Sequence, residues 1–227
     1  MMTTAPETAG STKPRLDRET IIAAGLELAA IPGTTSISVR DLGAHLGSDP
    51  TAIYRHFRSK DDLMSALLDE ITLRAVAEVD EDPQDWEGRV RHLAATTLSW
   101  MSRYPAVGAE AIVLTTHGPG EHAAIELILD AFRRAGLEGD DMVRHYALLA
   151  SHTLASAAGI ARARAEHGDH PDGGSPWFDE PVLVDPRRFP LIAEHSGRLA
   201  DLQDTDLYFL GVDLIIDSAR RTAARAH

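Results

Sequence analysis

The stretch DPTAIYRHFRSKDDL at residues 49–63 decides the fold prediction, because it contains two well-marked helix starts. Asp49 followed by Pro50 is typical of an N-cap and a first helical position. Ile53 and Phe57 lie four residues apart, so both are expected to point inward from the helix that begins there. This part of the stretch predicts a short helix from Pro50 to Phe57.

The second helix start is a capping-box pattern, in which Ser59 and Asp62 would satisfy free N–H groups at the beginning of a longer helix. The apolar residues of this helix form one stripe: Leu63, Leu67 and Ile71. A matching pattern lies upstream, where Ser38 and Asp41 would cap another short helix. That helix has one apolar side, made of Val39, Leu42 and Leu46, and Gly47-Ser48-Asp49 would end it. Two short helices joined by a three-residue turn that contains glycine are typical of a helix-turn-helix.

The rest of the chain is also predicted to be helical, and no sustained strand-like alternation is found. A first helix is expected at residues 18–31, capped by Asp17. Further helices are expected near Trp86–Tyr104, Ala106–Thr115, Glu121–Arg134, Asp141–Glu166, Pro190–Ala200 and Asp206–Ala224. Residues 167–189 are rich in Pro, Gly and Asp, which predicts a long loop. The predicted fold class is all-α. A three-helix helix-turn-helix domain would occupy residues 1–75, and the acidic break at 80–83 would lead into a helical ligand-binding and dimerisation domain at 76–227.

Composition narrows the function classes. The 227 residues include no cysteine, which excludes disulfides, thiolate zinc sites and cysteine nucleophiles. The sequence shows neither a signal peptide nor an apolar run long enough for a membrane span, so a cytoplasmic protein without membrane contacts is expected. The net charge of −13 opposes binding to a polyanion through bulk charge. Any contact with DNA must therefore come from a local basic patch.

Such a patch lies between Pro50 and Lys60, where the sequence has three basic residues, one histidine and no acid. In a helix-turn-helix the second helix enters the major groove with its N-terminal residues towards the bases. Thr51 and Ala52 would then face base edges, Tyr54, Arg55 and His56 would reach phosphate or base, and Ser38 and Lys60 would receive phosphates at helix starts. Lys13, Arg15 and Arg18 could form an arm along the DNA backbone. A solvated basic face is the simpler alternative for all of them.

Residues 16–71 resemble the N-terminal domain of the TetR family of bacterial one-component regulators. The resemblance rests on IIAAGLEL at 21–28, SVRDL at 38–42 and AIYRHFRSKDDL at 52–63. The last motif, an aromatic pair followed by Ser-Lys and an acidic helix start, is the most specific. Two positions depart from the family pattern. Ser48 replaces an apolar turn residue, and Asp49 replaces a serine cap, which brings a negative charge towards the phosphates.

The C-terminal part is similar, less sharply, to tetracycline-repressor-like ligand-binding domains through FPLIA at 189–193 and LYFLGVDLIID at 207–217. This resemblance implies a homodimer built from the last long helices. The residues agree with it, since small residues allow close helix approach and leucines at helical spacing form a seam. The expected interface residues are Ala155, Gly159, Leu207, Leu210 and Leu214.

A ligand cavity is expected between the helix at 86–104 and the helix at 141–166, lined by Trp100, Met101, Tyr104, His145 and His152. Ordinary core packing is the alternative for each of these residues. No metal and no cofactor are expected. His145 and His152 lie about 10 Å apart on one helix face, too far for one ion to bridge alone. His117 with His122, and the loop cluster of His167, Asp169, His170 and Asp172, are read as ordinary polar residues.

These observations predict a ligand-responsive transcriptional regulator that represses its target and is released from double-stranded operator DNA by a small-molecule inducer. No phosphate-binding loop, nucleophile elbow or metalloprotease motif is present, so no enzymatic activity is expected. The alternative is a helical small-molecule-binding or catalytic protein whose helix-turn-helix is unused.

Overall fold

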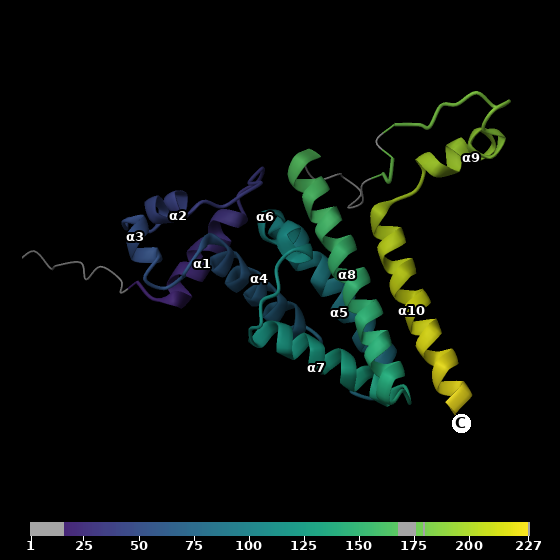
Figure 1. Ribbon diagram of the computed structural model, residues 1–227, viewed down its shortest axis with the longest axis horizontal. Coiled ribbons are helices and arrows are strands. Elements are labelled where there is room, and N and C mark those ends of the chain that lie inside the picture. The colour runs from purple at the N-terminus through teal and green to yellow at the C-terminus, as the bar shows by residue number, and fades with distance from the viewer. Residues whose placement is uncertain (1–15, 168–175, 179, 227) are drawn as a thin grey trace, which may run out of the picture.

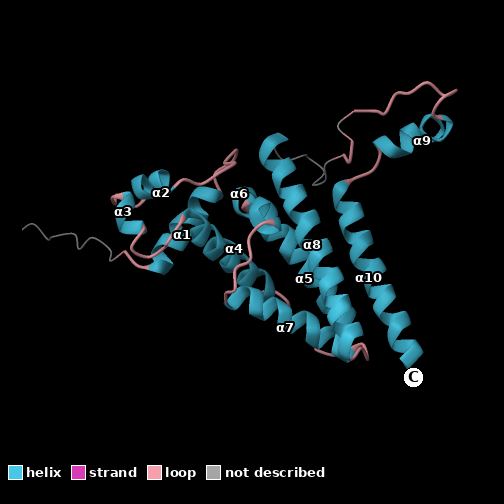
Figure 2. Ribbon diagram, in the orientation of Figure 1, coloured by secondary structure: helices cyan, strands magenta, loops and turns pink. Residues whose placement is uncertain are grey.

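The computed structural model describes residues 16–167, 176–178 and 180–226, and this part of the chain is all-α, as predicted (Figures 1 and 2). Its helices lie at α1 Arg18–Ala29, α2 Val39–His45, α3 Pro50–Ile53, α4 Lys60–Ala77, α5 Trp86–Arg103, α6 Pro105–Gly108, the 3₁₀ turn η1 Ala109–Ile112, α7 Pro119–Arg134, α8 Gly139–His167, α9 Pro190–Ala200 and α10 Asp204–Ala226. None of these helices is both long and apolar enough to cross a bilayer.

The capping predictions for the N-terminal helices are confirmed. Asp17, Ser38, Asp49 and Ser59 each accept a backbone hydrogen bond at the start of α1, α2, α3 and α4. The predicted length of α3 is wrong, because the helix ends at Ile53 and the chain continues through turns to Phe57. The N–H of Arg58 donates to Asp62 Oδ2 over 2.8 Å, so the cap of α4 already holds the chain where a longer α3 would continue.

Helix α4 joins the two parts of the molecule. It packs against α1 on one side and against α5 and α7 on the other. Leu63 and Leu67, near its start, are buried in the same core as Ile21 and Phe57, and Ile71 continues the buried stripe. The acidic break at 80–83 forms the link from α4 to α5, but the packing of α4 continues across it.

The predicted helix Ala106–Thr115 is wrong as a single element. It is split into α6 and η1 and ends at Ile112, and residues 114–117 form a loop. Gly108 lies so close to α5 that an added Cβ would meet Met101 Cβ at 2.8 Å. This close crossing positions the short helices across the end of α5.

The long helices α8 and α10 run side by side (Figure 1). His145 and His152, two turns apart on α8, both face α10. His145 Nε2 lies 3.2 Å from Ser218 Oγ, and His152 Nε2 lies 2.9 Å from the backbone oxygen of Tyr208. Helix α9, in contrast, stands away from the bundle and has no buried residue.

Candidate nucleic-acid interface and ligand cavity

The helix-turn-helix is shaped by two glycines. Gly47, in the turn, has φ of +58°, a conformation that glycine adopts without steric penalty. Gly43 lies inside α2, where an added Cβ would sit 2.9 Å from the Ser48 oxygen and 3.4 Å from the Pro50 ring. Together these glycines let the chain turn sharply and bring the start of α3 against α2.

The residues predicted to contact DNA lie on and just after α3 and at the starts of α2 and α4. Thr51, Arg55 and Lys60 are exposed, and Tyr54 is an exposed aromatic at 51% accessibility. Ser38, Ala52 and His56 are half-buried. A surface groove runs beside the turn after α3, and its walls include Arg18, Tyr54, Arg55, His56 and Arg58. Arg18, Arg55 and Arg58 thus share one groove, whose wall also includes Asp62.

The negative charge of Asp49 is used in the cap. Its Oδ1 accepts from the N–H of Thr51 over 2.8 Å and from the Thr51 hydroxyl over 2.6 Å. These hydrogen bonds, that of the side chain first, hold the pKa of the Asp49 carboxyl below its usual range. The Thr51 hydroxyl would have to leave Asp49 in order to reach a base edge.

Arg18 is held against the helix-turn-helix. Its guanidinium lies 4.3 Å from the centre of the Phe57 ring, donates to the His56 carbonyl over 3.1 Å and lies 3.7 Å from Asp62. It therefore closes the α3–α4 turn onto α1. Lys13 and Arg15, the other residues of the predicted arm, lie outside the described residues.

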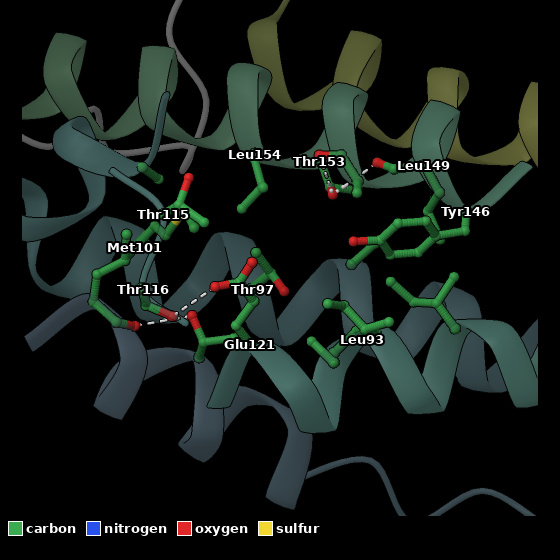
Figure 3. Close-up of a pocket in the computed structure, with 18 of the residues that line it drawn as sticks. Leu93, Thr97, Met101, Thr115, Thr116, Glu121, Tyr146, Leu149, Thr153 and Leu154 are labelled. Atoms are coloured by element: carbon green, nitrogen blue, oxygen red, sulfur yellow. Dashed lines mark hydrogen bonds between the residues drawn. The ribbon is translucent and has the colours of Figure 1, made fainter. Parts of the chain in front are cut away.

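A cavity of about 290 Å³ lies among α4, α5, η1, α7 and α8. Its wall is mostly aliphatic, with one methionine, Met101. Figure 3 shows Thr115 and Thr116 towards one side of the cavity and Tyr146 towards the other. The polar lining residues are Thr72, Thr97, Thr115, Thr116, Glu121, Tyr146 and Thr153.

Of the five residues expected to line a cavity, Met101 lies there, and Trp100, Tyr104, His145 and His152 do not. Trp100 stacks on Tyr104 and donates to Glu78 Oε1 over 2.9 Å, so it faces the C-terminal end of α4. Both histidines hold α10 in place. The expected residues lie on two helices that border the cavity, but His145 and His152 face α10, where they contact Ser218 and the Tyr208 oxygen.

The threonines and Glu121 were missed. Their signal in the sequence is weak. Thr115 stands at the end of the helix predicted at 106–115 with Thr116 just beyond it, and Glu121 resembles any acidic residue in the first turn of a helix. Glu121 instead folds back towards the loop. Its Oε2 accepts from the N–H of His117 over 2.6 Å and lies 3.0 Å from the Thr116 hydroxyl. His117 is the one described non-glycine residue with positive φ, at +51°.

Asp69 connects this edge of the cavity to α4. The carboxylate is buried and accepts from the N–H groups of Gly120 and Glu121, both over 3.0 Å, and from the Thr116 hydroxyl over 2.7 Å. It thus caps α7 from another helix, since Gly118 offers no side chain for this role. Any Cβ at Gly118 or Gly120 would collide with Asp69.

The five residues expected at a dimer interface lie along the outer side of the α8–α10 pair. Ala155, Gly159 and Leu207 share a groove with His152 and Trp177. Leu210 and Leu214 lie farther along α10 and are exposed at 53% and 56%. Leu207, Leu210 and Leu214 follow one another along α10, and within the described part of the chain no helix covers Leu210 or Leu214.

One group of described residues could offer ligand atoms to a metal. Asp80, Glu81 and His92 bring such atoms within 4.8 Å of one another at the α4–α5 link. His92 Nδ1 lies 2.6 Å from Glu81 Oε1, which is shorter than the spacing of two ligands on one ion, and its angles do not make a hydrogen bond. This geometry suits an ion pair. Of the loop cluster predicted around residue 170, His170, Asp169 and Asp172 lie outside the described residues.

Two family models match the chain. One, described as "Bacterial regulatory proteins, tetR family", covers residues 21–67. The other, described as "Tetracyclin repressor-like, C-terminal domain", covers residues 80–221. The first includes the helix-turn-helix, and the second includes most of the cavity and the α8–α10 pair.

Relatives and solved structures agree with these matches. The transcriptional repressor Rv1353c of Mycobacterium tuberculosis is 26% identical over 215 residues, covering 91% of this chain and 81% of the repressor. The tetracycline repressor protein class G of Vibrio anguillarum is 37% identical over 73 residues, covering 32% of this chain and 35% of that protein. The Streptomyces coelicolor protein ActR, solved in complex with actinorhodin, has a TM-score of 0.76 at 21% identity over 92% of this chain and 99% of ActR.

Proposed function

Because the chain belongs to the TetR family, we propose that two copies of it bind one operator and leave it when a small molecule enters the cavity described above. The protein is a ligand-responsive, DNA-binding transcriptional repressor. The observation that carries the proposal is the position of α4. Its first turn borders the helix-turn-helix, and its later turns supply Leu68 and Thr72 to the cavity wall.

For the DNA contact we propose the exposed surface around α3. Thr51 and Ala52 would face base edges, and Tyr54, Arg55, His56, Ser38 and Lys60 would contact phosphate or base. The groove between Arg18 and Arg58 supports this assignment, because it concentrates positive charge on an otherwise acidic protein. Residues 1–75 would serve DNA binding, with the end of α4 shared with the domain at 76–227.

For the dimer we propose that α8 and α10 of two subunits form a four-helix interface through Ala155, Gly159, Leu207, Leu210 and Leu214. The exposure of both leucines supports it, since apolar patches of this kind usually mark an interface. Helix α9 supports it as well, because Phe189 and Leu191 are exposed and α9 has no buried residue in the subunit. Such a dimer would hold two recognition helices about 34 to 36 Å apart, one turn of DNA.

Coupling between cavity and DNA would pass through the Asp69 cap. A ligand that binds better to a form with α4 displaced shifts the population towards that form. A coupling free energy of about 1 to 3 kcal/mol weakens operator binding about 5- to 150-fold. We propose that this cavity binds its ligand without catalysing a reaction. We also propose that the protein acts in the cytoplasm, where it would meet its operator DNA.

The test is binding to DNA from the upstream region of the protein's own gene, against a scrambled duplex, at two salt concentrations. We expect selective binding that weakens steeply with salt as phosphate counterions are released. Arg55→Ala should weaken it more than about tenfold, the effect of losing about 1.4 kcal/mol. Arg198→Ala on α9 removes the same charge outside the recognition surface and should leave it unchanged. Equal effects of the two variants would overturn the assignment of Arg55, and equal binding to both duplexes would favour a protein whose helix-turn-helix is unused.

A further inference from the structure

The cavity has an unbalanced charge. Glu121 is the single acidic lining residue, and no lysine, arginine or histidine lies in the wall among the described residues. One oxygen of its carboxylate, Oε2, is held by His117 and Thr116. The other, Oε1, makes no hydrogen bond to any described residue, and the Glu121 side chain is only half-buried. An acceptor is therefore left open at the edge of an apolar space.

The same edge has more acceptors than donors. The Thr116 hydroxyl has one hydrogen, yet it lies 2.7 Å from Asp69 Oδ1 and 3.0 Å from Glu121 Oε2. It can donate to one of these carboxylates at a time. The N-terminus of α7 offsets only about half of one charge, while two carboxylates lie beside it, Glu121 of its own first turn and Asp69 of α4. A donor brought by a ligand would correct this deficit.

The charge of Glu121 extends across the cavity. Burial first, and the negative charge of Glu121 second, raise the pKa of the Tyr146 phenol on α8. Tyr146 therefore keeps its proton and presents a neutral hydroxyl on the side of the cavity opposite Thr115 and Thr116 (Figure 3). Neither side of the described cavity wall carries a positive charge that could attract an anion.

We propose that the effector of this repressor is a hydrophobic cation, an apolar body carrying a protonated amine that binds Glu121 Oε1. Burying an ammonium group in an apolar cavity is unfavourable unless a counter-charge and hydrogen bonds receive it, and Glu121 with the neighbouring threonines provides both. A ligand carboxylate would meet a like charge with no compensating cation. This inference rests on the proposed function of the cavity as the effector site.

The test compares three probes with one hydrocarbon skeleton and different charge: 1-aminoadamantane, 1-adamantanol and adamantane-1-carboxylate. Affinity is measured by calorimetry on the full chain without DNA at pH 7. We expect the amine to bind at least about tenfold more tightly than the alcohol, and the carboxylate to bind most weakly.

Glu121→Gln is the decisive variant. A glutamine oxygen still accepts from the N–H of His117, so the loop is retained while the charge is lost. The amine should then lose at least about tenfold in affinity, and the alcohol should be unaffected. Glu126→Gln removes the same charge from the exposed side of α7 and should keep the wild-type order of affinities. Far-ultraviolet circular dichroism and melting temperature confirm that both variants fold.

The outcomes are separable. A carboxylate that binds as well as the amine, an unchanged order in Glu121→Gln, or binding of none of the three probes would each overturn the cation assignment. Release of operator DNA by each probe is measured in parallel by fluorescence anisotropy, with the same protein preparations bound to labelled operator. If the protein binds no operator while the amine binds as expected, the proposed function fails and the cation site stands. If DNA is released by the carboxylate and not the amine, the proposed function stands and the cation site fails.

Discussion

His152 Nε2 on α8 lies 2.9 Å from the backbone oxygen of Tyr208 on α10, and the two rings stack with their centres 5.8 Å apart. The Tyr208 hydroxyl continues the connection by donating to the Ala94 oxygen on α5 over 2.8 Å. Burial raises the pKa of Tyr208 strongly, so this donor keeps its proton throughout the physiological range. Helix α10 is thus held to α8 and α5 by these polar contacts.

Gly211→Ala should loosen this fastening. A Cβ at residue 211 would collide with the imidazole of His152, so the ring must leave its contact with the Tyr208 oxygen or α10 must shift from α8. We expect a loss of about 1 to 3 kcal/mol in the free energy of unfolding, the usual cost of overpacking, measured by urea denaturation at fixed protein concentration. Gly197→Ala on α9 is the control, because its Cβ would meet nothing within 4 Å and alanine favours the helix. Equal stability of the two variants would show that α10 tolerates displacement.

Asp130→Asn should weaken the junction of α5 and α7. Asp130, with a side chain 22% exposed, accepts from Arg89, Arg133 and Arg134. The variant should lose about 2 kcal/mol at pH 7, as for hydrogen bonds to charged groups. Asp140→Asn, in an exposed pair with Arg144, should change the stability by less than about 0.5 kcal/mol. A loss as large in the exposed variant would point to a general charge effect.

The same carboxyl predicts the acid behaviour of the protein. The arginines, Arg134 first, hold the pKa of Asp130 far below its usual range. A lowered folded-state pKa contributes stability above the unfolded-state pKa of about 3.9, and this contribution declines as the pH falls towards the folded-state value. The difference between wild type and Asp130→Asn should therefore be constant from pH 7 to about pH 5 and shrink below about pH 4. A difference that grows on acidification would contradict this sign.

Asp49→Ser should strengthen DNA binding. Serine caps a helix about as well as aspartate, and the substitution removes a negative charge from the surface proposed to face phosphates. We expect operator affinity to rise about three- to tenfold at low salt, with a smaller gain at high salt because exposed charges are screened. Anisotropy at two salt concentrations measures it. Asp61→Asn, two residues beyond the Ser59 cap of α4, tests whether the loss of any acidic residue near the patch has the same effect. An unchanged or weaker affinity of Asp49→Ser would mean that the aspartate cap is needed for the shape of α3.

Gly159→Leu should separate dimerisation from folding. An added Cβ at Gly159 meets nothing within 4 Å in the subunit, so the subunit should fold normally. In the proposed dimer the larger side chain would hold the helices apart, so the mass measured by light scattering should fall to that of one subunit. Glu126→Leu, at an exposed position on α7 outside the proposed interface, should leave the mass dimeric. A dimeric Gly159→Leu protein would place the interface elsewhere.

The features set by local chemistry could be predicted from the sequence. Asp49, Ser38 and Ser59 act within a few residues of their own positions, so their patterns predicted three helix starts correctly. The end of α3 could not be predicted, because it depends on the Arg58–Asp62 contact made by the following helix. The polar residues at the edge of the cavity could not be predicted for a similar reason. Asp69 lies 51 residues from the Gly120 N–H that it caps, and nothing near it in the sequence distinguishes it from a surface acid.

The Asp69 cap also sets a pivot. Since Gly118 and Gly120 leave no clearance against α4, we expect this helix to resist sliding along α7 at that point and to move by tilting about it. Lys60 lies nine residues away, an arm of about 14 Å at 1.5 Å per residue. A tilt of about 5° would move the start of α4 by about 1.2 Å, from the same helical rise. In a dimer the starts of the two α4 helices would move in opposite directions about the symmetry axis. The spacing of the two recognition helices would then change by up to twice that displacement.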